Sequence, residues 1–131
     1  MKLAKHVLNH LVALLEADDR IASAYLLGSA ARGQMRSDSD IDIALLPLRG
    51  VLISSVALAE LAGKLSYEAG RQVDLGLLSS ANLIYARQVL GSRRRLFTKE
   101  SFYVDLMETS LISMYLWFNE ECKELIHAYK H

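Results

Sequence analysis

The stretch Gly28-Ser29-Ala30-Ala31-Arg32-Gly33, followed by Ser39-Asp40-Ile41-Asp42, indicates the fold of this sequence most directly. Side chains two residues apart on a β-strand point to the same face, so Asp40 and Asp42 are expected to lie side by side. Two carboxylates this close disfavour each other's ionisation unless a cation compensates their charge. Oxygen ligands of this kind suit Mg²⁺, which adds phosphate oxygens and water to its coordination shell. The pair therefore predicts a Mg²⁺ site.

A third aspartate, Asp74, stands in the apolar run 73–78, where a charged residue needs a reason. If this run is a strand beside the one that carries Asp40, three carboxylates converge. Such a cluster suits two Mg²⁺ ions that clamp the attacking and leaving oxygens of an in-line phosphoryl displacement. We therefore predict Asp40, Asp42 and Asp74 as the catalytic and metal-binding residues. The alternative is a purely structural role, in which Asp74 caps a neighbouring backbone at a strand end.

The Gly28-Ser29 step predicts the phosphate-binding half of the same site. Glycine lets the backbone turn sharply and approach a ligand closely. Ser29 then opens a short helix whose free N–H groups can hold phosphate oxygens. Arg32, one turn on, could add a charge-assisted contact, or it could be a solvated residue paired with Asp38. For Ser39 we favour a role in orienting the following strand over a phosphate contact. A phosphate cradle beside an acid cluster implies a nucleoside triphosphate.

Apolar periodicity along the chain predicts an α/β (α+β) fold with a small mixed sheet and helices packed on it. Residues 1–131 are expected to form a single domain. Gly91 is expected to end the third helix and Pro47 the second strand. We expect helices over 1–16, 52–69, 82–90 and 99–129, and strands over 21–27, 40–46, 73–78 and 95–98.

Composition narrows the classes of function. Fifteen basic and fifteen acidic side chains cancel, so the chain lacks the basic surplus that binding to long nucleic acids usually needs. The one local basic cluster, Arg93 to Arg95, is most simply a solvated turn, although it could meet a nucleic acid or an acidic partner. No uncharged stretch is long enough to cross a bilayer, and the start of the chain lacks the features of a signal peptide. A single cysteine, Cys122, fits a reducing compartment. We expect a cytoplasmic protein without membrane or direct nucleic-acid partners.

Gly-Ser, ten intervening residues and Asp-x-Asp resembles the signature of the polymerase-β nucleotidyltransferase superfamily. The fuller run, Gly-Ser-x-Ala-Arg-Gly before Ser-Asp-x-Asp, is similar to the minimal nucleotidyltransferases, or MNT domains, many of which are antitoxins paired with HEPN-domain toxins. The resemblance covers about residues 21–78. It implies that Asp40 and Asp42 bind both metals and that Asp74 binds the catalytic metal and helps to activate the incoming hydroxyl. It also implies that Gly28 and Ser29 hold the triphosphate, and that AMP passes from ATP to a tyrosine of the toxin and silences it.

The residues after the strand of Asp74 bear on the acceptor. Most of them belong to one long helix, so an acceptor site built by this chain alone would be cramped. We therefore expect the acceptor to arrive on another protein in a hetero-oligomer. The aromatic residues of that helix could dock it or pack in the core; they are Tyr103, Tyr115, Trp117, Phe118 and Tyr129. Two alternatives remain: a nucleotidyltransferase acting on a small molecule such as an aminoglycoside, and a non-catalytic module that acts by docking.

Overall fold

The computed structural model of the chain describes residues 4–28, 40–92 and 94–129. Four described strands form one mixed sheet in the order β3-β2-β1-β4, which agrees with the small mixed sheet expected from the sequence. Strand β1 runs antiparallel to both β2 and β4, whereas β2 and β3 are parallel. The elements are α1 (Lys5–Glu16), β1 (Ile21–Leu27), β2 (Ile41–Pro47), α3 (Ser55–Ala69), β3 (Val73–Leu77), α4 (Leu83–Ser92), β4 (Arg94–Thr98) and α5 (Ser101–Tyr129).

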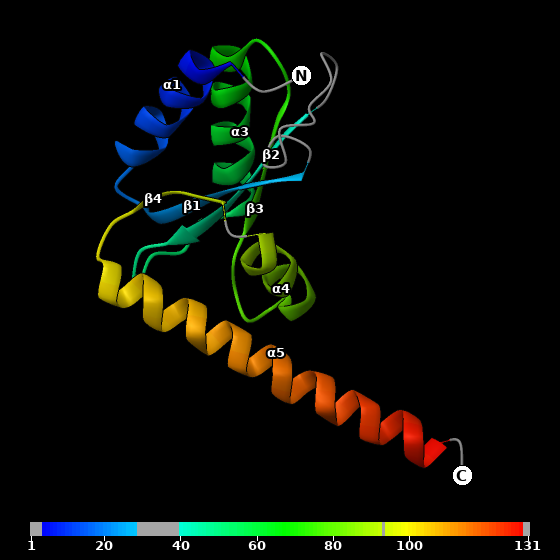
Figure 1. Cartoon of the computed structure of the whole chain (residues 1–131). Coiled ribbons are helices and arrows are strands. Elements are labelled where there is room, and N and C mark those ends of the chain that lie inside the picture. Colours follow the sequence, from blue (N-terminus) through cyan, green and yellow to red (C-terminus); the bar gives the residue numbers. More distant parts are fainter. Residues whose placement is uncertain (1–3, 29–39, 93, 130–131) are drawn as a thin grey trace.

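Helices cover both faces of this sheet. Helices α1 and α3 lie on one face, and α4 and the first turns of α5 lie on the other (Figure 1). A strand buried on both faces reads as a continuous apolar run rather than an alternating one, as β1 does. Side chains that alternate along β2 therefore enter two different cores. Ile41 and Ile43 pack towards α1 and α3, whereas Ala44 and Leu46 pack towards α4 and α5.

Local capping explains where some predicted bounds are wrong. Helix α3 begins at Ser55 rather than at 52, because the Ser54 side chain accepts a hydrogen bond from the Ala57 N–H at 3.1 Å. Helix α4 continues through Gly91 to Ser92, so the expected stop at that glycine is wrong. Strand β2 includes Pro47 as its last residue, a position where a missing N–H is tolerated. The expected bounds of β1 match the observed ones, and the remaining bounds lie within a few residues of them.

A buried polar network fastens α5 to the sheet. The Tyr25 hydroxyl of β1 donates a hydrogen bond to Glu108 of α5, and Arg95 of β4 donates to the same carboxylate at 2.7 and 3.1 Å. Arg95 therefore lies in a strand, as the expected strand over 95–98 had it, and the interpretation of its basic cluster as a solvated turn is wrong for this residue. Arg94 also belongs to β4, and Arg93 lies outside the described residues.

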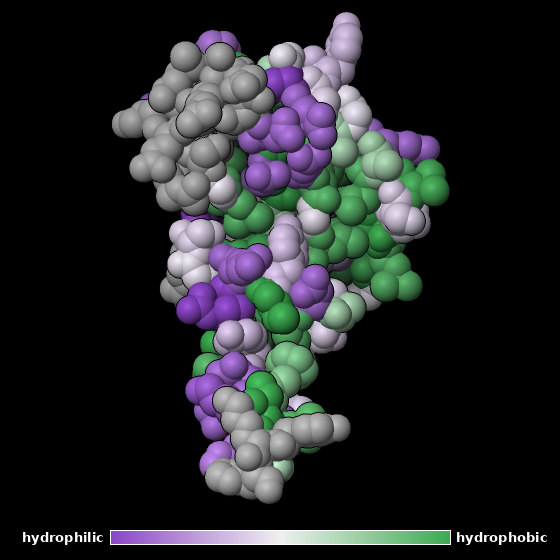
Figure 2. Space-filling model, turned by 90° about the vertical axis from the view of Figure 1, so that its right-hand side faces the viewer, coloured by the Kyte–Doolittle hydropathy of each residue, from purple (hydrophilic) through white to green (hydrophobic). Residues whose placement is uncertain are grey.

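Only the first half of α5 is covered by the rest of the domain. Val104 and Leu111 are buried, whereas Trp117 is 68% and Leu125 is 69% exposed. The second half projects away from the sheet (Figure 1). Figure 2 shows this projecting part below the body of the domain, with hydrophobic and hydrophilic residues side by side on the visible face. Within the described ranges, no helix has the length and apolar character needed to cross a membrane.

Candidate active site

The backbone brings Asp42 and Asp74 together at the beginning of two parallel strands. Asp42 is the register partner of Asp74, one position after the pair Ile41 and Val73. The Ile41 N–H donates to the Gln72 carbonyl at 2.9 Å, which fixes the two strands at their first residues. Both carboxylates therefore stand on the sheet face that also carries α4. The convergence expected from the sequence is present for this pair.

Helix α3 fixes the start of β3 from the other side. The Ser66 hydroxyl accepts a hydrogen bond from the Val73 N–H at 2.8 Å and donates one to the Ala62 carbonyl at 2.7 Å. Ser66 thereby ties the last turns of a packed helix to the residue that precedes Asp74. A side chain at this position is held by rigid elements rather than by a loop, as a precise site requires.

Among the described residues, no basic side chain offsets the charges around Asp42. Burial and then the charges of Asp74 and Asp40 raise the pKa of the half-buried Asp42. Asp40 itself is exposed, one residue before β2, and Asp74 is exposed and accepts a hydrogen bond from Gln72 Nε2 at 2.9 Å. Within the part of the chain that the structure describes, no three acidic, histidine or cysteine side chains are assembled as ready-made metal ligands. Asp42 and Asp74 are thus neighbours, but the three aspartates do not by themselves surround a metal position.

Gly28, at the end of β1, lies next to the Asp42 carboxylate. It has a φ of +66°, and a Cβ added there would lie 3.2 Å from Asp42 Oδ2. Glycine is therefore required both by the left-handed backbone and by the close approach to the carboxylate. The preceding residue, Leu27, is the register partner of Asp42. Ser29, Arg32 and Ser39 lie outside the described residues, so their phosphate-binding roles stay predictions.

A cavity of about 350 Å³ opens beside the two register-paired aspartates. The sequence interpretation missed Tyr85, which lines this cavity from α4. Burial and the charge of Asp42 raise the pKa of the Tyr85 phenol. A signal for this contact was present in Gly76, a glycine inside a strand and two residues after Asp74, because such glycines often mark close approach. The lining residues are Leu27, Asp42, Ile43, Asp74, Leu75, Gly76 and Tyr85.

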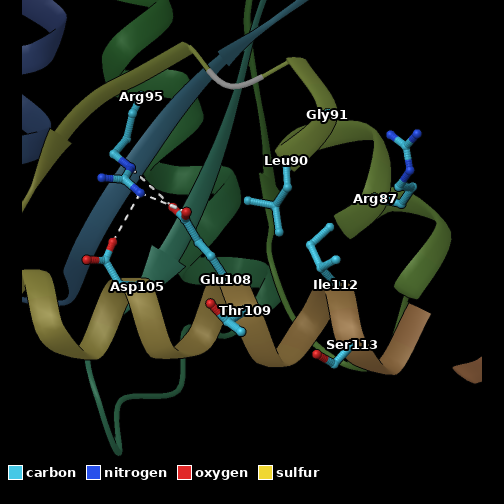
Figure 3. Close-up of a pocket in the computed structure, with 9 residues that line it drawn as sticks. All are labelled: Arg87, Leu90, Gly91, Arg95, Asp105, Glu108, Thr109, Ile112 and Ser113. Carbon is cyan, nitrogen blue, oxygen red and sulfur yellow. Dashed lines mark hydrogen bonds and ion pairs between the residues drawn. The ribbon is translucent and has the colours of Figure 1, made fainter. Parts of the chain in front are cut away.

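A larger hollow of about 660 Å³ lies between α4, β4 and α5, but its chemistry is that of a structural contact. Arg95 points at Glu108 and Asp105, whereas Arg87 points away from the hollow (Figure 3). The Arg87 guanidinium lies 6.0 Å from the centre of the Tyr115 ring. Because its acidic groups are paired with arginine, this hollow lacks the uncompensated carboxylates of the smaller cavity. The cavity beside Asp42 and Asp74 is therefore the candidate active site.

Known proteins share both the sequence pattern and the fold. A family model described as polymerase beta, nucleotidyltransferase matches residues 9–102. The protein adenylyltransferase MntA of Shewanella oneidensis is 31% identical over 119 residues, which cover 90% of this chain and 84% of that protein. A chain in the crystal structure of a toxin–antitoxin with AMP-PNP has a TM-score of 0.77 and 28% identity, with coverage of 98% of this chain and 100% of that one.

A further solved structure contains a tri-AMPylated Shewanella oneidensis HEPN toxin in complex with an MNT antitoxin. It matches with a TM-score of 0.74 and 27% identity, over 97% of this chain and 98% of the other. The family match includes all three aspartates and Tyr85, and the structural matches extend over nearly all of this chain. The chain therefore belongs to the polymerase beta nucleotidyltransferase family.

Proposed function

We propose that this protein is an antitoxin that transfers AMP from ATP to a tyrosine of a cognate HEPN-type toxin and thereby neutralises it. One observation carries the proposal: Asp42 and Asp74 are in register on adjacent parallel strands, next to Gly28 at the end of β1. Similarity to the adenylyltransferase MntA supports the reaction, and similarity to a complex with an AMPylated HEPN toxin supports the acceptor.

Mg²⁺ is the cofactor that this donor set fits. Burial and then the charges of the neighbouring carboxylates raise the pKa of Asp42, so a divalent cation would relieve the part of this effect that is repulsion. We assign Asp40, Asp42 and Asp74 as the ligands, with two ions as the full complement. When bound, Mg²⁺ supplies charge neutralisation at the phosphate oxygens.

The remaining residues would position ATP and the acceptor. In our proposal Gly28, Ser29 and Arg32 hold the triphosphate and Ser39 orients the strand of the aspartates. The acceptor phenol oxygen attacks the α-phosphorus, the bond to the β-phosphate oxygen breaks, and pyrophosphate leaves with that electron pair. Asp74 takes the phenol proton; its Oδ1 is held by Gln72, so we assign the proton to Oδ2.

The acceptor would be delivered by a protein that docks on α5. The projecting half of this helix carries exposed apolar side chains, including Leu116, Trp117 and Leu125, that the rest of the domain leaves uncovered. Exposed apolar groups concentrated on one element are typical of an interaction surface. We accordingly place the protein in a cytoplasmic hetero-oligomer with the toxin, without membrane or direct nucleic-acid contact.

The experiment is intact-mass spectrometry of the protein encoded beside this one, tested as the candidate toxin. The partner is incubated with this protein, Mg²⁺ and each of the four NTPs in turn. Mass increments of one or more AMP units with ATP, absent with Asp42→Ala, are the expected result. A partner that stays unmodified although it binds tightly would refute the enzymatic role and favour neutralisation by docking.

A further inference from the structure

Tyr85 sits directly on the backbone of β3. A Cβ added at Gly76 would lie 2.2 Å from the Tyr85 hydroxyl oxygen and 2.7 Å from Cζ, so only glycine leaves room for the phenol. Gly76 and Asp74 are two residues apart on one strand and share a face, which puts the phenol about 7 Å along the strand from the aspartate. The hydroxyl therefore lies in the same cavity as the carboxylates, one pleat further along the sheet.

The position of this tyrosine is fixed by α4. The Tyr85 N–H donates to the Asn82 side chain at 3.0 Å in the first turn of the helix. Ala86, Val89 and Leu90 of the same helix are buried against the sheet. In the hydrogen bonds among described residues, the Tyr85 hydroxyl takes no part, and the ring is half-buried. A rigidly held phenol with its hydroxyl open to a cavity is suited to contact a ligand.

The chemistry of the cavity indicates which ligand group lies there. One end carries Asp42 and Asp74. Leu27 lines the floor with its side chain, whereas Ile43 and Leu75 line it with their backbone, because their side chains pack towards α1 and α3. A nucleotide whose α-phosphate lies at the carboxylates would extend its next group, the ribose, over this floor. A sugar ring has an apolar face for the Leu27 side chain and hydroxyl groups for a neutral hydrogen-bonding partner at the far end. The ordinary pKa of a tyrosine is 10.0, and burial and Asp42 raise it for Tyr85, so the phenol keeps its proton at neutral pH and can donate.

We propose that Tyr85 is a specificity-determining residue whose hydroxyl, seated on Gly76, hydrogen-bonds a ribose hydroxyl of the bound nucleotide. This inference rests on the proposed nucleotidyl transfer at the same site. It assigns to the protein a preference for ribonucleotides over deoxyribonucleotides, and it assigns that preference to a single oxygen atom.

The test measures by calorimetry how tightly the protein binds ATP, 2′-deoxy-ATP and 3′-deoxy-ATP. Mg²⁺ is present and no acceptor protein is added. Wild-type protein should bind ATP about three- to tenfold more tightly than one of the two deoxy nucleotides, the effect of one neutral hydrogen bond. Tyr85→Phe should weaken ATP binding by the same factor and remove the difference between the nucleotides. Tyr67→Phe is the matched control, because Tyr67 is 85% exposed on α3, and it should leave the difference unchanged.

Two results would overturn the inference while the proposed function stands. One is a Tyr85→Phe protein that keeps the wild-type ratio of ATP to deoxy-ATP affinity. The other is a variant whose nucleotide affinities are all unchanged but whose KM for the acceptor protein rises, because the hydroxyl would then contact the acceptor. Wild-type protein that binds no nucleotide at all would refute the proposed function itself, and this inference with it.

Discussion

Asp42 and Asp74 face each other across β2 and β3, and the charge of Asp74 helps to raise the pKa of Asp42. The backbone of each strand is fixed at the residue before the aspartate by a hydrogen bond from Ile41 or Val73, so the two Cα atoms cannot separate without breaking the sheet. The protein thus holds a repulsion at its proposed site that substrate and cation would relieve. Such a site is expected to reduce the stability of the free protein.

Asp42→Asn should therefore stabilise the metal-free protein at neutral pH. The pKa of Asp42 in the folded protein lies above its ordinary value of 3.8, so the folded state binds this proton more tightly than the unfolded state does. The stability contributed by protonated Asp42 is lost as pH rises from the ordinary pKa of 3.8 through the raised pKa of the folded protein. Removing the charge should raise Tm by about 2–4 °C at pH 7.5 in EDTA, and this gain should vanish below about pH 3.5.

The control is Asp19→Asn, which removes an exposed negative charge outside the cluster. Thermal scans of both variants between pH 3 and pH 8 separate the cluster from a general charge effect. Equal Tm changes in the two variants would show that the repulsion at Asp42 does not affect stability.

Ligand binding should reverse the order of stabilities. Mg²⁺ with ATP at about 100 times the Kd should stabilise the wild type by about 2.7 kcal/mol, whereas Asp42→Asn should gain little. The same variant should transfer AMP at least about 100-fold more slowly, because one set of charge-stabilising contacts is lost. Differential scanning fluorimetry with and without EDTA measures the first effect, and the mass increment on the toxin measures the second. A variant that responds to Mg²⁺–ATP as the wild type does would rule out Asp42 as a metal ligand.

The sequence was sufficient for the elements whose signals are local. Strand β1 was predicted to the residue, because an apolar run there is bounded by Arg20 and Gly28. The start of α3 was missed because Leu52 continues the apolar spacing, while the cap at Ser54 sets the true boundary. Gly91 did not end α4, because a glycine in the last turn is only weakly unfavourable in a helix.

The site was predictable only in part, for a reason of geometry. Asp42 and Asp74 could be paired from sequence because strand position determines which face a side chain occupies. Tyr85 could not, since an apolar aromatic residue at helical spacing is most simply a core residue. Gly76 signals that some group approaches β3 closely, but which residue of α4 does so depends on how the helix lies on the sheet, and no local pattern encodes that.

Gly76→Ala should displace the Tyr85 ring from the cavity. The new Cβ would overlap the phenol, and overpacking of this kind costs about 1–3 kcal/mol of folding stability. The double variant Gly76→Ala, Tyr85→Ala removes the overlapping atoms, so the loss of stability should be less than the sum of the two single losses. Urea unfolding of the four proteins gives the coupling energy. Additive losses would show that the two residues do not contact each other.

The network at Glu108 should matter for stability but not for chemistry. Glu108→Ala leaves the Tyr25 hydroxyl and the Arg95 guanidinium without their shared partner, at a cost of about 2–4 kcal/mol. Glu108→Gln keeps an acceptor oxygen and should lose less. Glu120→Gln is the control, because its ion pair with Lys123 is exposed at 3.8 Å and should contribute less than about 1 kcal/mol. Urea midpoints rank the three variants, and an Ala variant as stable as the control would contradict the assigned role.

The projecting half of α5 should matter for binding to the toxin but not for stability. Trp117 and Leu125 are mostly exposed, so Trp117→Ser with Leu125→Ser should leave the unfolding free energy within about 1 kcal/mol of the wild type. Association with the toxin should fall by at least about tenfold, since exposed aromatic groups of this kind commonly dominate an interface. ATP affinity should stay unchanged, because Asp42 and Tyr85 lie against the sheet rather than on this half of the helix. Calorimetry with toxin and with ATP measures both affinities on one protein sample. Toxin affinity equal to the wild type would place the docking surface on another part of the domain.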